Sequence, residues 1–545
     1  MIKVSKPISS IEFSQILQKI KFTGVGKTPR RIGVAVSGGL DSIALCYLLR
    51  DWSISNGCKL MAFTVDHQLR DESSGEAKNV GELMRKLGID HEIMKINWSR
   101  STTMTKESEK EIFKHSSSFP TTSQLETNAR IERYTLLAQA CKQNSIHHLF
   151  IGHHQNDQLE TLIMRFARGS GIEGLSAMSN EIKLPVVKSA DAIGVKLVRP
   201  LLDCTKDRLR ETCVSFNIPW FEDPTNTSLT YKRNAVRDSL SKIEQKFQEG
   251  DERLRALSTE GLKQILEHMQ DHRQVLNEKV SQIVKSKARF SLKYGICIID
   301  IPPDASISSS GWLNNLPISF RVLSYLLRWI RCAEYSPRLV QIRTLHAHIL
   351  QQLILPPEQR KNLTIAGVLI SPPSKNSGVL QHRWTMYRQP FNKTNAFDKV
   401  DMCEIHFENK EGELEGILLW DNRFFVGLRL NDRFLQEKYI KNNEIKFYVN
   451  RFMKKDYDMI KKMSYGKYMK ALNEFIYHVP TIGRETFPLV MMKNQKTGQE
   501  KILSIPTLGL DFYPQIGSCW VKFRNNVINI NTTNDQDIIG GGSFL

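Results

Sequence analysis

The first 200 residues of the chain alternate between short apolar segments and longer segments with apolar residues at helical spacing. The apolar segments, which predict buried strands, cover residues 32–36, 59–65, 91–96 and 146–151. The segments between them predict helices that begin near Ser42 and cover residues 75–87 and 125–137. Strands that alternate with helices are typical of a parallel sheet covered on both faces, so we predict a doubly wound α/β domain.

The pattern changes beyond residue 240. Residues 242–291 and 318–353 have apolar residues at helical spacing and predict a mainly helical middle domain over 241–395, with short strands between 363 and 390. A hairpin around Asp421-Asn422 indicates a mixed α+β C-terminal domain over 396–545. With an N-terminal extension at 1–30 and the α/β domain at 31–240, three domains suit a chain of 545 residues.

A glycine-rich turn separates the first predicted strand from its helix. Residues 37–42 read Ser-Gly-Gly-Leu-Asp-Ser, and the two glycines allow a tight turn and close approach to a ligand. Such a turn at a helix start presents backbone N–H groups and the helix dipole to an anion, which predicts a phosphate site. A Walker loop is excluded because the turn contains no Lys. The alternative is an ordinary turn in which Asp41 or Ser42 caps the helix.

A second polar segment follows the fourth predicted strand. Residues 152–161 read Gly-His-His-Gln-Asn-Asp-Gln-Leu-Glu-Thr, with Asn156 as the predicted N-cap of a helix. Asp157 and Glu160 are three apart and share a face of its first turn. They suit a cation such as Mg²⁺ or an amine substrate, or they are acids that the helix dipole favours. A metallohydrolase with a His-His-x-x-Asp site is a further alternative, but it leaves the glycine-rich turn unexplained.

The composition of the chain favours some classes of binding partner and argues against others. Lys and Arg number 76 against 57 Asp and Glu, a formal net charge of +19, which favours a polyanion such as nucleic acid, although solubility alone also accounts for it. The nine cysteines include no C-x-x-C pair, which argues against a zinc ribbon, an iron–sulfur site or a secreted disulfide framework. No uninterrupted apolar run reaches membrane-spanning length, so we predict no membrane partner.

Three further segments have competing or limited interpretations. Residues 1–31 contain one acid, Glu12, and an apolar helix face, which is typical of an organelle transit signal or of a packed first helix. Residues 438–470 interleave Lys and Arg with Tyr and Phe, which predicts either an RNA-binding surface or a helix with an aromatic core face. The polar stretch at 99–123 is predicted to be an exposed insertion.

The motifs taken together resemble the tRNA(Ile)-lysidine synthetase family of N-type PP-loop ATPases. The resemblance covers about residues 31–240, and the motifs occur in the family's order. They are residues 37–42, 65–70, 128–134, 152–161, 168–176, 199–202 and 222–226, followed by Arg233-Asn234 and Arg237. Asn156 departs from the family, whose helices usually carry an acid at that position.

The resemblance implies a reaction that joins free lysine to the wobble cytidine of an isoleucine tRNA with a CAU anticodon. ATP adenylates the cytidine C2 oxygen with release of pyrophosphate, and the lysine ε-amine then displaces AMP to form lysidine. The implied cofactors are ATP and Mg²⁺. The oligomeric state is left open, a homo-oligomer included.

The resemblance also implies roles for individual residues. The phosphates of ATP would be held by Ser37, Gly38, Gly39, Leu40, Asp41 and Ser42, with Asp41 as a tentative Mg²⁺ ligand. Asp157 and Glu160 would hold lysine or assist its deprotonation, and with Asp41 they form the expected catalytic set. Lysine or tRNA contacts are expected from His67, Arg70, Arg130, Arg133, His153, Arg199 and Arg237.

Two other functions fit parts of the sequence. A PP-loop tRNA thiolase usually needs paired cysteines to carry sulfur, and this chain has no C-x-x-C. A non-catalytic tRNA-binding protein with a relic ATP site is disfavoured by the complete glycine-rich turn. For a eukaryotic source we expect a mitochondrial location because of the acid-poor start, and otherwise a cytoplasmic one.

Overall fold

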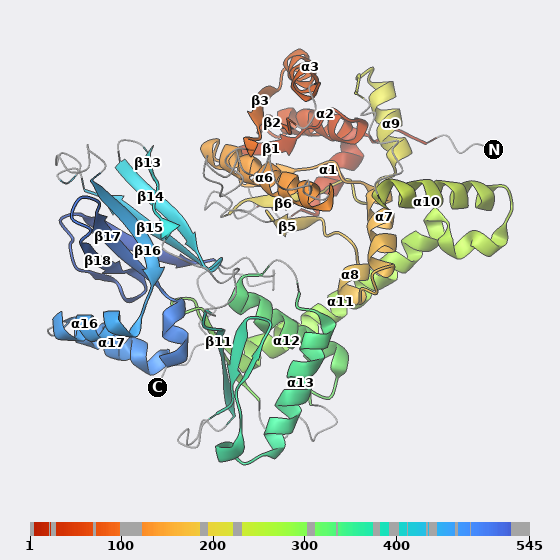
Figure 1. Cartoon of the computed structure of the whole chain (residues 1–545). Coiled ribbons are helices and arrows are strands. Elements are labelled where there is room, and N and C mark those ends of the chain that lie inside the picture. Colours follow the sequence, from red (N-terminus) through yellow and green to blue (C-terminus); the bar gives the residue numbers. More distant parts are fainter. Residues whose placement is uncertain are drawn as a thin grey trace, which may run out of the picture. The chain divides into compact units, whose positions relative to one another are not determined.

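The structure, a computed structural model, forms two compact units, Met1–Gln274 and Val275–Leu545, which are described separately (Figure 1). No helix in the part of the chain that the structure describes is long and apolar enough to cross a bilayer. Predictions for Arg70, residues 99–121 and residues 222–226 fall outside that part. The described residues are 5–20, 22, 29–68, 72–98, 122–185, 194–221, 232–301, 311–333, 336–373, 382–391, 403–410, 413–431, 434, 444–463, 467–479 and 481–524.

The first unit contains a six-stranded sheet in the order β3-β2-β1-β4-β6-β5, in which β5 is antiparallel to its neighbour and the other pairs are parallel. The strands are β1 (Arg31–Ala35), β2 (Lys59–Asp66), β3 (Asp90–Lys95), β4 (His148–Phe150), β5 (Glu181–Lys183) and β6 (Lys196–Val198). The four predicted strands are therefore confirmed as β1 to β4. Because the strand order reverses between β1 and β4, the loops after these two strands flank the position where ligands bind in such sheets.

Helices cover both faces of this sheet, which confirms the doubly wound prediction. One hydrophobic cluster joins β1 and β2 to four helices, and a second cluster joins the opposite face to one long helix. The helices of the first cluster are α1 (Ser10–Gln18), α2 (Leu40–Ser55), α3 (Ser73–Lys86) and α9 (Lys206–Ser215). The second cluster contains α6 (Thr122–Gln143).

The N-terminal helix α1 is part of the core of the first unit. Ile8, Phe13 and Leu17 are buried in the cluster that includes α2. Both terminal nitrogens of Arg208 donate to the Glu12 carboxylate, at 2.7 and 2.6 Å, so α1 is also bound to α9. The described part of this segment thus has the packing that the first-helix interpretation predicts.

The remaining helices of the first unit extend from the end of β4. Apolar residues of α7 (Gln155–Phe166) and of the first half of α11 (Thr259–Lys287), a helix that continues into the second unit, share a small hydrophobic cluster, and the Ser176 hydroxyl donates to the Met269 carbonyl. The other helices here are α8 (Ile172–Leu175), α10 (Lys232–Gln248) and η3 (Glu252–Leu257). This arrangement places α10 against α7, which carries two of the predicted catalytic acids, Asp157 in its first turn and Glu160 one turn later.

The second unit contains three sheets that share one hydrophobic core. The middle region includes α12 (Leu316–Arg331), α13 (Leu339–Ile354) and η5 (Pro357–Gln359). Its sheet has the order β7-β8-β11-β10-β9, with β7 (Ala288–Ser291), β8 (Ile296–Asp300), β9 (Leu363–Ile365), β10 (Val368–Ser371) and β11 (Arg383–Arg388). The prediction of helix to residue 291 is wrong, because Ala288 and Phe290 alternate with less buried neighbours and pair with β8. Whether 241–395 and 396–545 are separate domains stays a prediction.

The C-terminal region of this unit is dominated by antiparallel strands. One sheet has the order β12-β16-β17-β18-β19 and the other β13-β14-β15-β20. The strands are β12 (Cys403–Glu404), β13 (Phe407–Lys410), β14 (Glu413–Trp420), β15 (Phe424–Leu430), β16 (Ile445–Arg451), β17 (Pro488–Asn494), β18 (Glu500–Ile505), β19 (Leu510–Asp511) and β20 (Gly517–Phe523). The helices are α16 (Lys454–Met463), α17 (Lys467–His478), η8 (Thr481–Thr486) and η9 (Pro506–Leu508).

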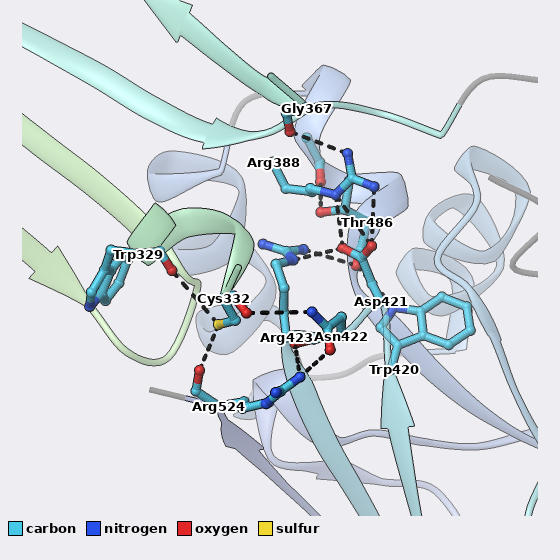
Figure 2. A network of polar contacts seen from close by, with 11 residues as sticks. Trp329, Cys332, Gly367, Arg388, Trp420, Asp421, Asn422, Arg423, Thr486 and Arg524 are labelled. Atoms are coloured by element: carbon cyan, nitrogen blue, oxygen red, sulfur yellow. Dashed lines mark hydrogen bonds and ion pairs between the residues drawn. The ribbon is translucent and has the colours of Figure 1, made fainter. Parts of the chain in front are cut away.

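The predicted hairpin around Asp421 and Asn422 is confirmed and is the centre of a polar network (Figure 2). Both residues have left-handed backbone angles, φ 46° and 54°, as a tight hairpin turn requires. The Asp421 carboxylate accepts hydrogen bonds from Arg423 at 2.7 Å and from Arg388 of β11 at 3.2 Å. Because Arg423 is 1% exposed, this ion pairing removes the cost of an isolated buried charge.

The aromatic and basic segment at 438–470 is only partly an exposed surface. Phe447 of β16 and Phe452 are buried in the core of the second unit, so they are not available to stack on bases. Tyr439 and Tyr465 lie outside the described residues. The core interpretation is correct for the burial of these two phenylalanines, but its predicted helix is wrong here, because Ile445–Arg451 forms strand β16 and Phe452 follows it. An RNA-binding role of this region stays a prediction.

Candidate active site

The glycine-rich turn after β1 leads directly into α2. The N-cap of α2 is Gly39, and no side chain caps it, so the alternative of Asp41 or Ser42 as the cap is wrong. The Ser42 hydroxyl donates to the Gly39 carbonyl at 2.9 Å and accepts from the Ser37 N–H at 3.2 Å. Gly38 has φ +89°, and a Cβ atom there would come within 2.8 Å of Val80. Only glycine suits this position.

The end of β4 packs against the start of α2. Gly152 lies so close that a Cβ atom on it would be 2.8 Å from the Asp41 carbonyl oxygen and 3.0 Å from the Ser42 backbone nitrogen. Leu40, at the start of α2, is buried, so its backbone and not its side chain is available to phosphate. The two polar segments predicted from the sequence therefore meet at the β1–β4 switch point.

Helix α7 begins two residues earlier than predicted. Its N-cap is His154, whose backbone N–H donates to the Asp157 carboxylate at 3.0 Å. The prediction of Asn156 as N-cap is therefore wrong, and the Asn156 side chain instead accepts from the Lys206 N–H at 3.4 Å. Asp157 occupies the third helical position, where a carboxylate satisfies the N-cap backbone.

The His154 ring lies between two of the predicted catalytic carboxylates. Its Nε2 is 3.4 Å from Asp41 Oδ2 and 3.6 Å from Asp157 Oδ2, and the side chain is 3% exposed. Burial favours the neutral ring, but the hydrogen bond to Asp41 and the charge of Asp157 raise the pKa of His154. Burial is likewise overcome at Asp157, where the charges of His154 and Arg233 lower the pKa of the carboxyl.

Two arginines of α10 bind the acids of α7. Arg233 donates to Asp157 at 2.5 Å and to Glu160 at 2.6 Å, and Arg237 donates to Glu160 at 2.7 Å. Glu160 is 1% exposed, so its charge is buried and compensated. Arg237, predicted to contact lysine or tRNA, is thus bound to a catalytic candidate, and any cation that binds this acid pair competes with two guanidinium groups.

His153 and Arg199 bind each other. Arg199 Nε donates to His153 Nδ1 at 3.1 Å, and a second nitrogen of Arg199 donates to the Ser179 carbonyl at 2.9 Å. Burial lowers the pKa of Arg199 to about 10. Burial and the charge of Arg199 also lower the pKa of His153 to about 3, against the opposing charge of Asp157. His153 is therefore a neutral ring whose Nδ1 accepts a hydrogen bond.

The other predicted contact residues lie on α6 and after β2. The guanidinium groups of Arg130 and Arg133 are 5.0 and 5.1 Å from the ring centre of Tyr134, within cation–π range. Burial and the charge of Arg133 lower the pKa of His67. The buried His67 Nδ1 has no hydrogen-bond partner among the described residues, which leaves it available to a ligand.

Comparison with known proteins agrees with this geometry. Residues 6–244 match the family described as a PP-loop domain. A probable tRNA(Ile)-lysidine synthase of Schizosaccharomyces pombe is 28% identical over 505 residues, which are 91% of this chain and 95% of the relative. The enzyme so named in Orientia tsutsugamushi is 24% identical over 506 residues, 90% of this chain and 95% of the relative. Residues 6–244 thus carry a PP-loop domain, and the chain is similar to proteins named tRNA(Ile)-lysidine synthase over about nine tenths of its length.

Another relative of this name, from Wolbachia sp. subsp. Brugia malayi, is 34% identical over 231 residues, 42% of this chain and 47% of the relative. That match spans less than half of the relative, whereas the two longer alignments include most of the second unit. The lysidine synthase resemblance, which the motifs carry only to about residue 240, therefore extends over most of the chain.

The candidate site offers one oxygen that suits a magnesium ion. Asp41 Oδ1 is buried and has no hydrogen-bond partner among the described residues, and carboxylate oxygens are typical Mg²⁺ ligands. No group of three or more His, Cys, Asp or Glu side chains in the described ranges forms a metal site. The residues thus fit a Mg²⁺ ion bound through one carboxylate and substrate phosphates, and no metallohydrolase cluster is found among them.

Two members of the site are not singled out by sequence pattern. Arg233 stands out only as part of a basic cluster and of a family motif, and the spacing of residues does not reveal its bond to Glu160, 73 positions away. His154 is indistinguishable from His153 in the sequence, although the two rings have different partners. The signal available for both is their place beside the predicted acids in the family motifs.

Proposed function

We propose that this chain ligates free lysine to C2 of the wobble cytidine of tRNA(Ile) with a CAU anticodon, in two steps at the β1–β4 switch point. The supporting observation is that this point brings together the glycine-rich turn, with Asp41, and the acids of α7. The first feature suits ATP and the second suits an amine substrate, so both reactants have a place at one edge of the sheet.

The first step is adenylation of tRNA. The C2 oxygen of the cytidine attacks the α-phosphorus of ATP, and pyrophosphate leaves. Backbone N–H groups at the start of α2, between Gly39 and Ser42, would stabilise the charge on the departing pyrophosphate. Asp41 Oδ1 would hold Mg²⁺, which supplies charge neutralisation on the phosphates when bound.

The second step is attack of the lysine ε-amine on C2, with departure of AMP carrying the former C2 oxygen. The amine must lose protons to become a nucleophile and to complete the product. Asp157 and Glu160 would hold the lysine ammonium or assist its deprotonation. Because Arg233 and Arg237 already bind these acids, the first of these roles requires a guanidinium group to give way.

The expected tRNA contacts divide by exposure. Arg130 is exposed and Arg133 is partly exposed, so both are proposed to meet phosphates directly. His67 is proposed to contact a substrate through its unpartnered nitrogen. Arg199 and His153 are hydrogen-bonded to each other, and we propose that this buried pair positions the residues that contact the substrates. We also propose tRNA contacts from Arg70 and from the second unit, and assembly into a homo-oligomer.

For a eukaryotic source we propose a mitochondrial location, supported by the acid-poor first 31 residues. Removal of residues 8–20 from the mature protein would take Ile8, Phe13 and Leu17 out of the core. A cleaved leader that includes α1 would therefore contradict the structure. Amino-terminal mass spectrometry of the mature protein tests this location and its processing.

The test of the proposed function is an incubation with ATP, labelled lysine and tRNA(Ile) bearing CAU. We expect lysine to be retained on the tRNA with an equal amount of AMP formed. Asp41→Ala should abolish this turnover while tRNA affinity stays nearly intact. Sulfur incorporation would favour a thiolase, and tRNA binding without AMP formation would favour a non-catalytic protein.

A further inference from the structure

We propose that His154 is a positioning residue whose Nε2–H holds Asp41 of the glycine-rich turn and Asp157 of α7 in one arrangement. The proposal rests on the proposed function, since it names how that site keeps two of its carboxylates in place. It assigns distinct roles to two adjacent histidines that the sequence does not separate.

The first argument is the position of the ring. Asp41 and Asp157 come from elements that are more than 100 residues apart, yet each has an oxygen within 3.6 Å of the same His154 nitrogen. Two negative carboxylates this close to one nitrogen repel each other, and a donor between them offsets that repulsion with an attraction to each. The ring therefore holds the Asp41 and Asp157 carboxylates at positions that the backbone contact between the two segments brings close together.

The second argument is that the backbone fixes the ring in advance. His154 is the N-cap of α7, its N–H donates to Asp157 at 3.0 Å and its carbonyl accepts from Gln158 at 3.3 Å. Gly152, two residues earlier, packs against the Asp41 backbone. Because both flanks are held, the ring needs little reorganisation when substrates bind, which is what a positioning group requires.

The third argument is an unsatisfied atom. His154 Nδ1 is buried and has no hydrogen-bond partner among the described residues, and the residue is 2% exposed. A buried polar nitrogen without a hydrogen-bond partner lowers the stability of the folded protein. Stability alone therefore does not account for a histidine at this position. By contrast, Nδ1 of the neighbouring His153 accepts from Arg199.

The consequence concerns the orientation of Asp41. With Oδ2 held by His154, the unpartnered Oδ1 is the carboxylate oxygen that stays available for Mg²⁺ and the phosphates of ATP. Loss of the ring would let the Asp41 carboxylate rotate. The loss should therefore weaken binding of Mg²⁺-ATP and slow adenylation more than it weakens binding of tRNA or lysine.

The experiment compares His154→Leu, which removes the donor, with His154→Gln, whose amide nitrogen can replace Nε2. His147→Leu, at an exposed position on the approach to β4, is the matched control. We expect His154→Leu to lower the rate of AMP formation and the affinity for Mg²⁺-ATP by roughly 10–100-fold, as loss of an outer ligand partner does. His154→Gln should recover part of both, and KM values for tRNA and lysine should change little.

Calorimetric titration with a non-hydrolysable ATP analogue and Mg²⁺ gives a readout that does not depend on turnover. Wild-type values of both rate and affinity in His154→Leu would overturn the proposal. So would a folded His154→Gln that is no better than His154→Leu, because the donor would then not matter. If the wild-type protein binds Mg²⁺-ATP but forms no lysidine, the proposed function fails, and the titrations still decide the role of His154.

Discussion

Gly152 lies in backbone contact with Asp41, so the residues that follow β4 pack directly against the start of α2. A Cβ atom at Gly152 would be 2.8 Å from the Asp41 carbonyl oxygen, and backbone atoms have little freedom to move away. This contact sets the separation between the glycine-rich turn and the acids of α7. It also gives a direct way to disturb the site without removing any functional group.

Gly152→Ala is expected to push the two segments apart. The overpacking should destabilise the first unit by about 1–3 kcal/mol and lower the rate of AMP formation at least tenfold. Gly75→Ala in α3 is the control, because a Cβ atom there has no neighbour within 4 Å. Thermal melting and steady-state assays of both variants test this, and an active, fully stable Gly152→Ala protein would contradict it.

Arg233→Leu is expected to leave buried carboxylates without their shared partner. Arg233 bridges Asp157 and Glu160, so its loss should cost about 1–3 kcal/mol of unfolding free energy and most of the activity. Arg233→Lys keeps the positive charge but loses the forked guanidinium geometry, so its stability and activity should lie between those of the wild type and of Arg233→Leu.

Arg253→Leu is the control for the two Arg233 variants. The Arg253 side chain is 89% exposed, and among the described residues it bonds only to the nearby Asp251. Urea unfolding measured alongside AMP formation separates the two effects. Equal stability of Arg233→Leu and Arg253→Leu would show that the acids of α7 do not depend on α10.

Phe13→Ala tests whether α1 belongs to the folded catalytic unit. Phe13 is 1% exposed, and truncating a buried phenylalanine costs about 3–5 kcal/mol. Ile11 lies on the same helix but is 74% exposed, so Ile11→Ala should change stability by less than about 0.5 kcal/mol. Similar melting temperatures for the two variants would mean that the helix contributes nothing to the core.

Acid should destabilise the first unit through His148. Burial and the charge of Lys196 lower the pKa of His148 to about 4, so the unfolded state binds a proton that the folded state rejects between pH 6.5 and 4. Stability is then full above the unfolded pKa and falls with pH, by about 2 kcal/mol between pH 7 and 5 for this group.

The measurement is the urea midpoint across this pH range for the wild type, for His148→Leu and for the exposed His406→Gln. The slope should flatten in His148→Leu and persist in His406→Gln. An unchanged slope in His148→Leu would show that protonation of this ring does not oppose folding.

The sequence predicts those parts of the fold that local pattern determines. Strands β1 to β4 and the turn at 37–42 follow from apolar runs and adjacent glycines, which act locally. The cap of α7 is mispredicted because Asp157 bonds back to His154 in preference to a cap at Asn156. β7 and β8 are missed because their alternation follows a long helix without a break.

Long-range pairings in the site lie beyond such reasoning. The bonds of Arg233 and Arg237 to Glu160 depend on how α10 packs on α7, and no spacing rule encodes that packing. Likewise, Phe447 and Phe452 have the spacing of a stacking surface, yet Phe447 within β16 and Phe452 just after it are buried in the core. Motif order supplies the residues of the site, but their partners come only from the structure.

The central claim is tested most directly by the identity of the wobble nucleoside after reaction. tRNA(Ile) with a CAU anticodon is incubated with the enzyme, ATP and isotopically labelled lysine, then digested to nucleosides for mass spectrometry. The account predicts a labelled lysidine in place of cytidine, formed only with ATP and lost in Asp41→Ala. Unmodified cytidine under conditions where the protein binds both ATP and tRNA would contradict it.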